Sequence, residues 1–515
     1  MSTPIKAGNL LYSLKKELVN LSVNLHPSSN YQIAKRFICR RSFLSNVTKL
    51  TAGAVAGGTA LSSFHFVDTD SSFSTVGILG AGVAGLTAAV ELKERGIDFS
   101  VFEASHQAGG RVVTIYDEIG KGIHTELGGE FIDSNHSDMF RLATKFGISL
   151  VDIQKEVSDL RLSRESYFFQ GKFIAEPDII KHFHLFAGAF LEDIRKLENG
   201  ESDLFRNFDL MSISDYLGSK GVSGWFLNLL EAAFTAEYGL DANAQSALNF
   251  LTMIDAGPNN EVRLYGDSDE RYVLQGGNQR LLKKMAGSLN ERLHVNHFCK
   301  SISYDQGMYI LEFSNGRVFR CRYLLVSIPF TALRKIKLNI QMSPEKRRVI
   351  DELHYGTNSK IVFGVTCPIW RLSGKSGYLF SDFIQNAWDS TISLRKSQLA
   401  SYTIFQGGTL GRNLKADQST LYLNELNRLY PGFDAFFNKK RLISNWLDYP
   451  LTRGSYAVYR TGDWSTFAGL ESERVDNLYF AGEHCSIDFR GYMNGAAETG
   501  RKAAESITCE LQHMK

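Results

Sequence analysis

The chain has 515 residues, of which 43% are hydrophobic and 22% are charged, an ordinary composition for a folded protein of more than one domain. Its 57 Lys and Arg residues against 55 Asp and Glu residues give a formal net charge of +2, so the charge balance gives no reason to expect nucleic acid as a partner. Six cysteines lie scattered without C-x-x-C spacing, which predicts neither a zinc site nor a disulfide framework.

The first part of the chain has features of an export signal. Arg40-Arg41-Ser42-Phe43-Leu44 resembles the twin-arginine motif, and a mildly apolar stretch runs from Leu50 to Leu61 behind it. That stretch is too short and too weakly apolar to cross a bilayer, so no stable membrane span is expected. Residues 1–70 are therefore predicted to be an export signal or a disordered leader. Such a signal implies a periplasmic or secreted protein, and a cytoplasmic one if the signal does not function.

A glycine-rich turn then joins a short apolar run to a helical pattern. Residues 76–79 predict a buried parallel strand, and Gly80, Gly82 and Gly85 give the G-x-G-x-x-G spacing before a helix over 86–95. The glycines allow a tight turn, the approach of a pyrophosphate to the backbone, and close packing of helix on strand. The helix N-terminus offers N–H groups to the phosphates, so this turn predicts dinucleotide binding.

A second strand over residues 99–102 delivers Glu103, whose carboxylate is placed to accept both ribose hydroxyls of an adenosine. Gly109-Gly110-Arg111 follows, in which two glycines let a loop pass close to a cofactor and the arginine neutralises phosphate or flavin charge. Together these motifs resemble the flavin-dependent amine oxidase family, which includes monoamine and polyamine oxidases and L-amino-acid oxidases. The resemblance implies FAD rather than NAD.

The middle of the chain alternates between sheet and helix patterns. Residues 125–131 read as a strand that reaches a loop, and from about 136 to 260 the pattern is helical, with a helix start at Ser212. Sheet signals return after Tyr272, and Asn315-Gly316 between two apolar runs is a strong hairpin signal.

The last third of the chain carries three further elements. Ser343-Pro344-Glu345 opens a helix, because proline suits the first helical position. Residues 477–483 predict a strand that ends in glycine and acid, and residues 497–511 predict an amphipathic helix.

The resemblance covers about residues 73–512 and implies an α/β fold. In this fold a discontinuous Rossmann-like FAD-binding domain of the GR2 type is joined to an α+β substrate-binding domain. The FAD-binding domain is assigned to residues 73–135, 262–342 and 450–515, and the substrate-binding domain to residues 136–261 and 343–449.

The resemblance also implies which residues contact FAD. In this family the carboxyl-terminal Gly482-Glu483 contacts the ribityl-pyrophosphate, and the helix that carries Met493 directs its N–H groups at the flavin O2. The strand corresponding to Val295 offers backbone polar groups to the adenine. The full set of cofactor-binding residues implied is Gly80, Gly82, Ala84, Gly85, Glu103, Ala104, Gly110, Arg111, Gly128, Gly129, Val295, Trp446, Gly482, Glu483 and Met493.

Three side chains are expected to carry the chemistry, and no metal is implied. Lys360 matches the family's lysine that contacts a water beside flavin N5 and assists the reaction with oxygen. Tyr456 and Tyr492 would form an aromatic cage that aligns the amine and excludes water. Ser455 stands where some members carry the cysteine that bonds to flavin, so non-covalent FAD is expected.

The reaction implied is hydride transfer from the α-carbon of a neutral amine to flavin N5. The imine then hydrolyses to an aldehyde and ammonia, and oxygen regenerates FAD with release of hydrogen peroxide. The partners expected are a small-molecule amine or amino acid and molecular oxygen, and a homodimer is compatible with the sequence.

The substrate class stays open between alternatives. The loop around Gly128-Gly129 carries Glu130 and Asp133 and no arginine, which favours amines or polyamines over substrates with a carboxylate. Arg371 or Arg453 can serve a carboxylate from another direction, which keeps L-amino-acid oxidase as an alternative. A flavin desaturase or isomerase and a non-catalytic flavoprotein are the other classes considered.

Overall fold

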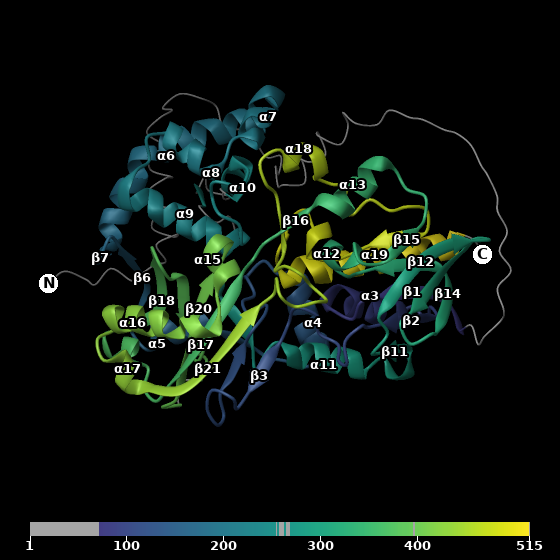
Figure 1. Cartoon of the computed structure of the whole chain (residues 1–515), viewed down its shortest axis with the longest axis horizontal. Coiled ribbons are helices and arrows are strands. Elements are labelled where there is room, and N and C mark those ends of the chain that lie inside the picture. The colour runs from purple at the N-terminus through teal and green to yellow at the C-terminus, as the bar shows by residue number, and fades with distance from the viewer. Residues whose placement is uncertain (1–71, 254, 257–261, 264–267, 395–396, 514–515) are drawn as a thin grey trace. The chain divides into compact units, whose positions relative to one another are not determined.

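The computed structural model describes residues 72–253, 255–256, 262–263, 268–394 and 397–513. The twin-arginine motif and the apolar stretch behind it lie outside these ranges. The described chain forms two compact units (Figure 1). The parallel-sheet unit consists of residues 72–110, 282–353 and 467–513, and the antiparallel-sheet unit of residues 111–281 and 354–466, apart from the gaps given above.

The parallel-sheet unit contains the predicted strand, glycine turn, helix and second strand. Its sheet has the order β11-β2-β1-β14-β13-β12-β15, and β23 pairs with β14 beside this path. β1 runs parallel to both β2 and β14, with Val76 opposite Phe99 and Tyr323. The elements are β1 (Ser72–Leu79), α3 (Val83–Glu94), β2 (Phe99–Phe102), α11 (Gln279–Gly287, shared with the other unit), η2 (Asn290–Arg292), β11 (Leu293–His294), β12 (Cys299–Asp305), β13 (Met308–Phe313), β14 (Val318–Val326), α12 (Phe330–Leu333), β15 (Lys337–Asn339), α13 (Pro344–Glu352), β23 (Leu478–Phe480), η4 (Glu483–Cys485) and α19 (Met493–His513).

Local sequence signals account for several of these elements. The hairpin predicted at Asn315-Gly316 is confirmed: β13 and β14 pair antiparallel, and Gly316 has a φ of 82° that favours glycine. The helix start at Ser343 is also confirmed, since its side chain accepts from the backbone N–H of Lys346 at 3.0 Å. The helix α19 lies against α3 so closely that a Cβ on Gly500 would lie 2.2 Å from the Ala84 carbonyl oxygen.

The antiparallel-sheet unit is built on a second sheet of order β21-β17-β20-β19-β18-β6-β7. Its strands and short ladders are β3 (Thr114–Tyr116), β4 (His124–Glu126), β5 (Leu150–Asp152), β6 (Ser163–Phe169), β7 (Lys172–Ile174), β8 (Asp255–Ala256), β9 (Val262–Arg263), β10 (Tyr272–Leu274), β16 (His354–Tyr355), β17 (Ser359–Val365), β18 (Lys375–Ser381), β19 (Gln385–Asp389), β20 (Ala400–Gln406), β21 (Phe437–Asn445) and β22 (Ala457–Val458). Its helices are α4 (Ser137–Lys145), α5 (Ile153–Asp159), α6 (Glu176–Glu198), α7 (Ser202–Leu210), α8 (Ile213–Ser219), α9 (Gly224–Tyr238), α10 (Ala247–Met253), α14 (Ile369–Leu372), α15 (Gly408–Asn413), η3 (Ala416–Gln418), α16 (Ser419–Leu429), α17 (Phe433–Phe436) and α18 (Asp463–Phe467, whose last residue belongs to the other unit).

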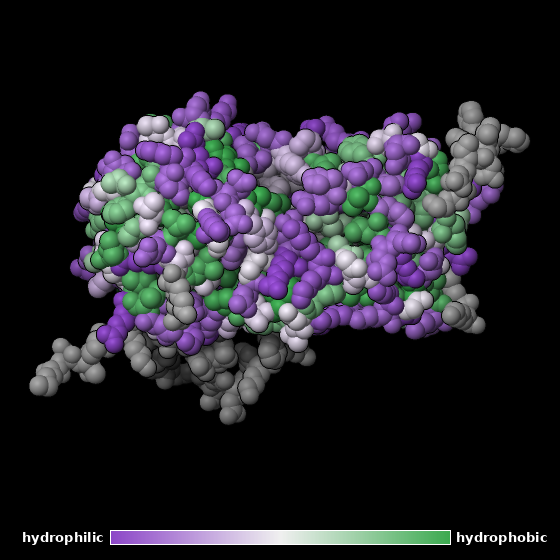
Figure 2. All heavy atoms as spheres, turned by 90° about the horizontal axis from the view of Figure 1, so that it is seen from below, coloured by the Kyte–Doolittle hydropathy of each residue, from purple (hydrophilic) through white to green (hydrophobic). Residues whose placement is uncertain are grey.

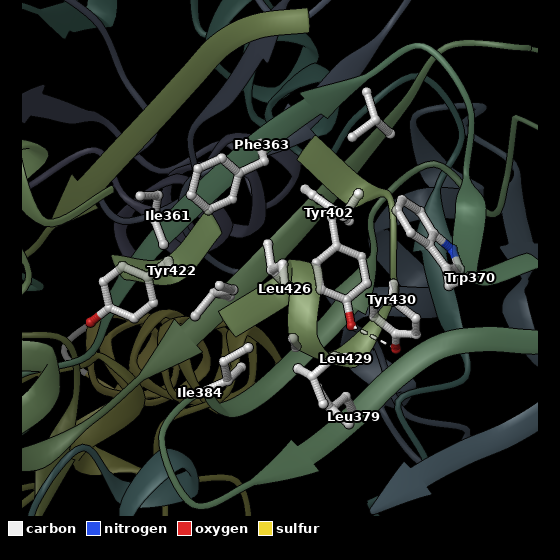
Figure 3. Close-up of a cluster of buried hydrophobic side chains, with 14 of the residues drawn as sticks. Ile361, Phe363, Trp370, Leu379, Ile384, Tyr402, Tyr422, Leu426, Leu429 and Tyr430 are labelled. Atoms are coloured by element: carbon white, nitrogen blue, oxygen red, sulfur yellow. Dashed lines mark hydrogen bonds between the residues drawn. The ribbon is translucent and has the colours of Figure 1, made fainter. Parts of the chain in front are cut away.

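A large apolar core holds this second sheet together. Side chains of β17 and β20 pack with α14 and α16, and Figure 3 shows the hydroxyl groups of Tyr402 and Tyr430 facing one another, 3.2 Å apart. All labelled side chains of this cluster are buried: Ile361, Phe363, Trp370, Leu379, Ile384, Tyr402, Tyr422, Leu426, Leu429 and Tyr430. Such a core makes the sheet a rigid platform for the side chains that leave its strands.

The helical pattern expected over residues 136–260 is wrong in part. Four strands, β5, β6, β7 and β8, interrupt it among the described residues, while the predicted helix start is confirmed because the Ser212 hydroxyl caps α8. β6 pairs in parallel with β18, some 200 residues later in the chain, and this pairing buries Tyr167, Phe168 and Phe169. Because the strand that pairs with β6 lies so far away in the sequence, no hairpin signal stands beside this segment. Its own residue pattern does not distinguish a strand from a helix.

The boundaries of the two units differ from the predicted domain boundaries. Residues 111–135 and 450–466 and the described part of residues 262–281, assigned from the resemblance to the FAD-binding domain, lie in the antiparallel-sheet unit. Residues 343–353, assigned to the substrate-binding domain, lie in the parallel-sheet unit. Within the antiparallel-sheet unit, Lys360 donates to the 126–130 loop and the Gly356 N–H donates to the Tyr456 carbonyl. Assignment of one unit to FAD and the other to the substrate stays a prediction.

The surface is mixed in polarity. Figure 2 shows hydrophilic and apolar side chains interspersed over the face in view. Among the described residues, none of the helices combines the length and the apolar character needed to cross a bilayer.

Candidate active site

In the parallel-sheet unit, the turn between β1 and α3 contains the predicted phosphate-binding glycines, and these differ in the space that the protein leaves for a side chain. Gly80 has a φ of 107°, and its N–H donates to the Phe102 carbonyl at 2.8 Å. A Cβ on Gly85 would lie 2.0 Å from the Gly80 carbonyl oxygen, so this glycine is required by the turn itself. Among the described residues, a Cβ on Gly82 would come within 4 Å only of Gly110 Cα, at 3.9 Å, so none of them requires Gly82 to lack a side chain.

Glu103 stands at the end of β2 with its carboxylate fixed against this turn. The side chain is buried, and its two oxygens accept the Ala81 N–H at 2.8 Å and the Ser105 N–H at 2.9 Å. Each carboxylate oxygen has a second lone pair, so two hydroxyl groups can still be accepted. The neighbouring Ala104 is half-buried.

A second loop lies beside the turn. The Gly109 N–H donates to the Ala81 carbonyl at 2.9 Å, and a Cβ on Gly110 would lie 3.2 Å from Gly82 Cα. Gly110 has a φ of 58°. Glycine here therefore permits two stretches of bare backbone to approach one another, which is the arrangement that a pyrophosphate between them needs.

Val295 directly follows β11, which ends at His294. Its carbonyl lies 2.7 Å from His297 Nδ1, and the segment is joined to β2 by the Glu103 N–H, which donates to the His294 carbonyl at 2.8 Å. The candidate adenine-binding backbone and the candidate ribose-binding carboxylate are thus neighbours in the structure.

The carboxyl-terminal candidates lie around the start of α19 in the same unit. Gly482 has a φ of 147°, and its N–H lies 3.0 Å from the Thr499 hydroxyl, while Glu483 accepts the Gly491 N–H at 3.1 Å. Tyr492 and Met493 are half-buried at the beginning of the helix. The helix N-terminus gives this region the partial positive charge that a reduced flavin would favour.

These features fit FAD. The open space at Gly82, the bare backbone of Gly110 and the N-terminus of α3 suit a pyrophosphate. The buried Glu103 carboxylate suits a ribose.

In the antiparallel-sheet unit, the candidates gather around the loop over residues 126–130. A Cβ on Gly128 would lie 1.9 Å from the Arg111 carbonyl oxygen and 3.1 Å from the Trp446 ring, and the Gly129 N–H donates to the same carbonyl at 3.1 Å. Arg111, Gly128, Gly129 and Trp446 are therefore brought together although 335 residues separate the first from the last (446 − 111).

Lys360 reaches this loop from β17. Its ammonium group donates to the carbonyl oxygens of Glu126 at 3.0 Å and Gly128 at 2.9 Å, and to a carboxylate oxygen of Glu130 at 2.7 Å. An ammonium group has three N–H donors, so all three find acceptors in the loop. Lys360 is buried, so its charge is shielded from bulk water.

Tyr456 and Ser455 lie beside the beginning of the same strand. The Tyr456 hydroxyl donates to the Ala236 carbonyl at 3.2 Å, and the Ser455 hydroxyl donates to Asn358 Oδ1 at 2.6 Å. The Arg111 guanidinium donates to the Ser455 carbonyl. Tyr492 belongs to the other unit, so the aromatic cage of two tyrosines stays a prediction.

Burial perturbs several acids near this loop. It raises the pKa of Glu126 and of Glu270 to about 8 and that of Asp133 to about 7, and it lowers the pKa of His136 to about 3. The three acids therefore carry less negative charge at neutral pH than three exposed carboxylates would, and His136 is neutral.

Two residues that the sequence does not single out prove to organise this site. The Trp388 indole N–H donates to Glu130 at 2.9 Å, and Asn278 donates its side-chain N–H groups to the carbonyls of Gly129 and Glu130 at 3.0 and 2.7 Å.

Arg371, a candidate for binding a substrate carboxylate, has a structural partner. Its guanidinium contacts Asp389 at 2.6 Å, and Asp389 also accepts the Trp370 indole N–H at 2.8 Å and the Thr391 hydroxyl at 2.7 Å. Its side chain is 13% exposed and that of Asp389 1%. Arg453 is exposed.

Replacement of Asp389 by alanine is expected to destabilise the protein by about 3–5 kcal/mol, because a buried guanidinium and an indole N–H lose their acceptor. Urea unfolding measures the loss. Asp159→Ala serves as the control, since its ion pair with Lys155 is largely exposed and its loss costs at most about 1 kcal/mol. Equal losses in the two variants would contradict a structural role for the Arg371 pair.

No group of three or more His, Cys, Asp or Glu side chains with metal-binding geometry occurs in the part of the chain that the structure describes.

Comparison with known proteins gives one consistent result. The family model described as flavin containing amine oxidoreductase matches residues 83–508. The human amine oxidase [flavin-containing] B is 24% identical over 454 residues, which cover 84% of this chain and 85% of that protein. The fold is similar to cyclohexylamine oxidase from Brevibacterium oxydans IH-35A (TM-score 0.73, 19% identity, 85% of this chain and 99% of that one). It is also similar to a putrescine oxidase bound to putrescine (TM-score 0.72, 18% identity, 85% and 100%).

Proposed function

This chain belongs to the family of flavin-containing amine oxidoreductases and carries out FAD-dependent amine oxidation, and we propose that its substrates are amines without a carboxylate. Oxidation at the α-carbon then gives an aldehyde and ammonia, with oxygen reduced to hydrogen peroxide. An L-amino-acid oxidase, which would give a 2-oxo acid, is the alternative.

The charge of the side chains around Lys360 carries this choice. The carboxyl groups of Glu126, Glu130 and Asp133 are all buried near or within the same loop, and the ammonium of Lys360 is already paired with Glu130. A substrate carboxylate entering this region would find the Lys360 ammonium already neutralised by Glu130 and bonded to two backbone carbonyl oxygens. Neither monoamines nor diamines need a cation here, so both belong to the proposed class.

The arginines considered for a substrate carboxylate support the same choice. The charge of Arg371 is balanced by the buried Asp389, which also fixes the direction of the guanidinium. Arg453 is exposed, and the Arg111 guanidinium donates to a backbone carbonyl of its own unit. A built carboxylate site would instead present a bidentate arginine.

When bound, FAD supplies the two-electron oxidation and passes the electrons to oxygen. The chain's own residues bind and orient the reactants. Glu103 is placed to accept ribose hydroxyls and the N-terminus of α3 to bind phosphate. Lys360 supplies a fixed positive charge for the reaction with oxygen, and the Tyr456 ring helps to orient the amine.

Two further features complete the proposal. Ser455 has a hydroxyl group where a thioether to flavin would need a thiol, which supports non-covalent FAD. Arg40-Arg41 supports export of the folded protein to the periplasm or the exterior, and the protein stays in the cytoplasm if this signal does not function.

A peroxide-coupled assay on the purified yellow holoenzyme tests the proposal. Tyramine, cyclohexylamine and putrescine are compared with a panel of L-amino acids at equal concentration. We expect peroxide with at least one amine and none above background with the amino acids. Formation of a 2-oxo acid from an amino acid, at a rate above that of every amine, would overturn the choice of substrate.

A further inference from the structure

Glu130 is the counter-ion of the lysine that the reaction with oxygen is proposed to use. Its carboxylate oxygen Oε2 lies 2.7 Å from Lys360 Nζ, and its other oxygen accepts the Trp388 indole N–H at 2.9 Å. The side chains of the pair are 5% and 6% exposed, so water has little access to either charge. Both oxygens of the carboxylate are thus held in place by named donors.

The remaining charged groups near the ammonium do not share this role. The Glu126 carboxylate faces the other way and accepts the Thr114 hydroxyl at 2.9 Å and the Asn278 N–H at 2.8 Å. Burial raises the pKa of Glu126 to about 8, so this acid is largely protonated at neutral pH. His124 on the same strand has a pKa lowered by burial. Glu130 is therefore the one described carboxylate that ion-pairs with Lys360.

Through its ion pair with Lys360, Glu130 also joins the 126–130 loop to β17. Lys360 lies on β17, where the rings of Trp388 and Phe405 have their centroids 5.1 and 6.0 Å from Nζ. Glu130 lies at the end of the loop that contains Gly128 and Gly129. All three hydrogen bonds of the ammonium have an ionised donor, but only the bond to Glu130 joins two opposite charges. Because the pair is buried, this Coulomb attraction is stronger than it would be in water and helps to direct the ammonium toward the loop.

We propose that Glu130 is a positioning residue for the oxygen reaction, which acts by holding the ammonium of Lys360 against the 126–130 loop through the buried ion pair. The proposal rests on the proposed function in assigning Lys360 a part in that reaction. Glu130 itself acts through Lys360, and Trp388 only fixes the direction of the carboxylate.

The test separates the two half-reactions in the holoenzyme. Stopped-flow absorbance follows reduction of the bound flavin by an amine, and separately its reoxidation by oxygen after photoreduction. Glu130→Ala is expected to slow reoxidation about tenfold or more, because the ammonium loses its fixed direction, and Lys360→Met is expected to slow it at least as much. Reduction of the flavin by the amine is expected to slow by less than reoxidation does. Glu130→Asp is expected to recover part of the reoxidation rate.

Two further variants keep the test independent of folding. Trp388→Phe removes one neutral donor and keeps the ion pair, so its reoxidation rate is expected to fall less than that of Glu130→Ala. In the double variant Glu130→Ala, Lys360→Met, reoxidation falls no further than in Lys360→Met alone. The melting temperature of the double variant is expected to exceed that of Lys360→Met, because the single variant leaves the buried Glu130 carboxylate without its partner.

The results that overturn the proposal are distinct from failure of the proposed function. Wild-type reoxidation in Glu130→Ala, or multiplicative losses in the double variant, would show that Glu130 does not act through Lys360. Equal slowing of both half-reactions would show a general structural role. If no amine reduces the flavin, the proposed function fails, but the photoreduced enzyme and the melting temperatures still report on the pair.

Discussion

Replacement of Gly82 by alanine is expected to weaken FAD binding strongly and leave the apoprotein folded. In the protein alone the added Cβ meets only Gly110 Cα, at 3.9 Å, and the backbone φ of −78° is one that alanine adopts freely. A pyrophosphate that lies against the N-terminus of α3 would occupy the space of this Cβ. We expect the dissociation constant of FAD to rise about a hundredfold, which corresponds to about 3 kcal/mol.

Gly85→Ala is the matched variant, three residues further along the same turn. Its Cβ would lie 2.0 Å from the Gly80 carbonyl and 2.6 Å from the Ser327 hydroxyl, so the backbone of the turn must move. The free energy of unfolding of its apoprotein is expected to be lower than that of the wild-type apoprotein by at least about 1–3 kcal/mol.

Urea unfolding of the two apoproteins and titration with FAD, followed by flavin fluorescence, distinguish the effects. If Gly82→Ala binds FAD as the wild-type protein does, the cofactor does not lie over this turn. If it unfolds as readily as Gly85→Ala, the space at Gly82 has another explanation.

Glu126→Gln is expected to change the pH dependence of stability. Burial raises the pKa of Glu126 to about 8, from 4.5 in the absence of the fold, so between these values the folded protein binds more protons than the unfolded chain. Its contribution to stability is therefore lost as the pH rises through this window. At pH 5 the neutral acid and the amide are nearly equivalent, whereas at pH 9 the variant is expected to be more stable by on the order of 3–5 kcal/mol.

The measurement is the difference in free energy of unfolding between variant and wild type at pH 5, 7 and 9, with FAD absent. The difference isolates Glu126, because Asp133 and Glu270, whose pKa values burial also raises, are present in both proteins. Asp159→Asn, at a largely exposed carboxylate, is the control and should show no such trend. A difference that is the same at all three pH values would mean that Glu126 is ionised throughout.

The 126–130 loop is held by donors from several parts of the antiparallel-sheet unit. Lys360, Asn278 and Ser444 all donate to carbonyl oxygens of this loop. A bare glycine at position 128 allows the Arg111 segment to approach. The loop thus has little freedom to adjust, and a change at any one donor is expected to reach the others.

The sequence alone predicted those elements whose formation depends on residues close together in the chain. The strand, glycine turn, helix and second strand at residues 72–103 follow from apolar runs and glycine spacing, and so do the hairpin at Gly316 and the capped helices at Ser212 and Ser343. The resemblance of the motifs to a known family also gave FAD and amine oxidation.

Only the tertiary structure decided which side chains meet in the antiparallel-sheet unit. The strand β6 carries no clear signal, because its partner β18 lies about 200 residues away. Lys360 reads in the sequence as a strand lysine, and its pairing with Glu130, 230 residues earlier, depends on a loop and a sheet packing together. Arg371 likewise reads as a free cation until the fold places it on Asp389. A sequence determines periodicity and backbone freedom directly, whereas the charge of a buried group depends on the partners that folding brings to it.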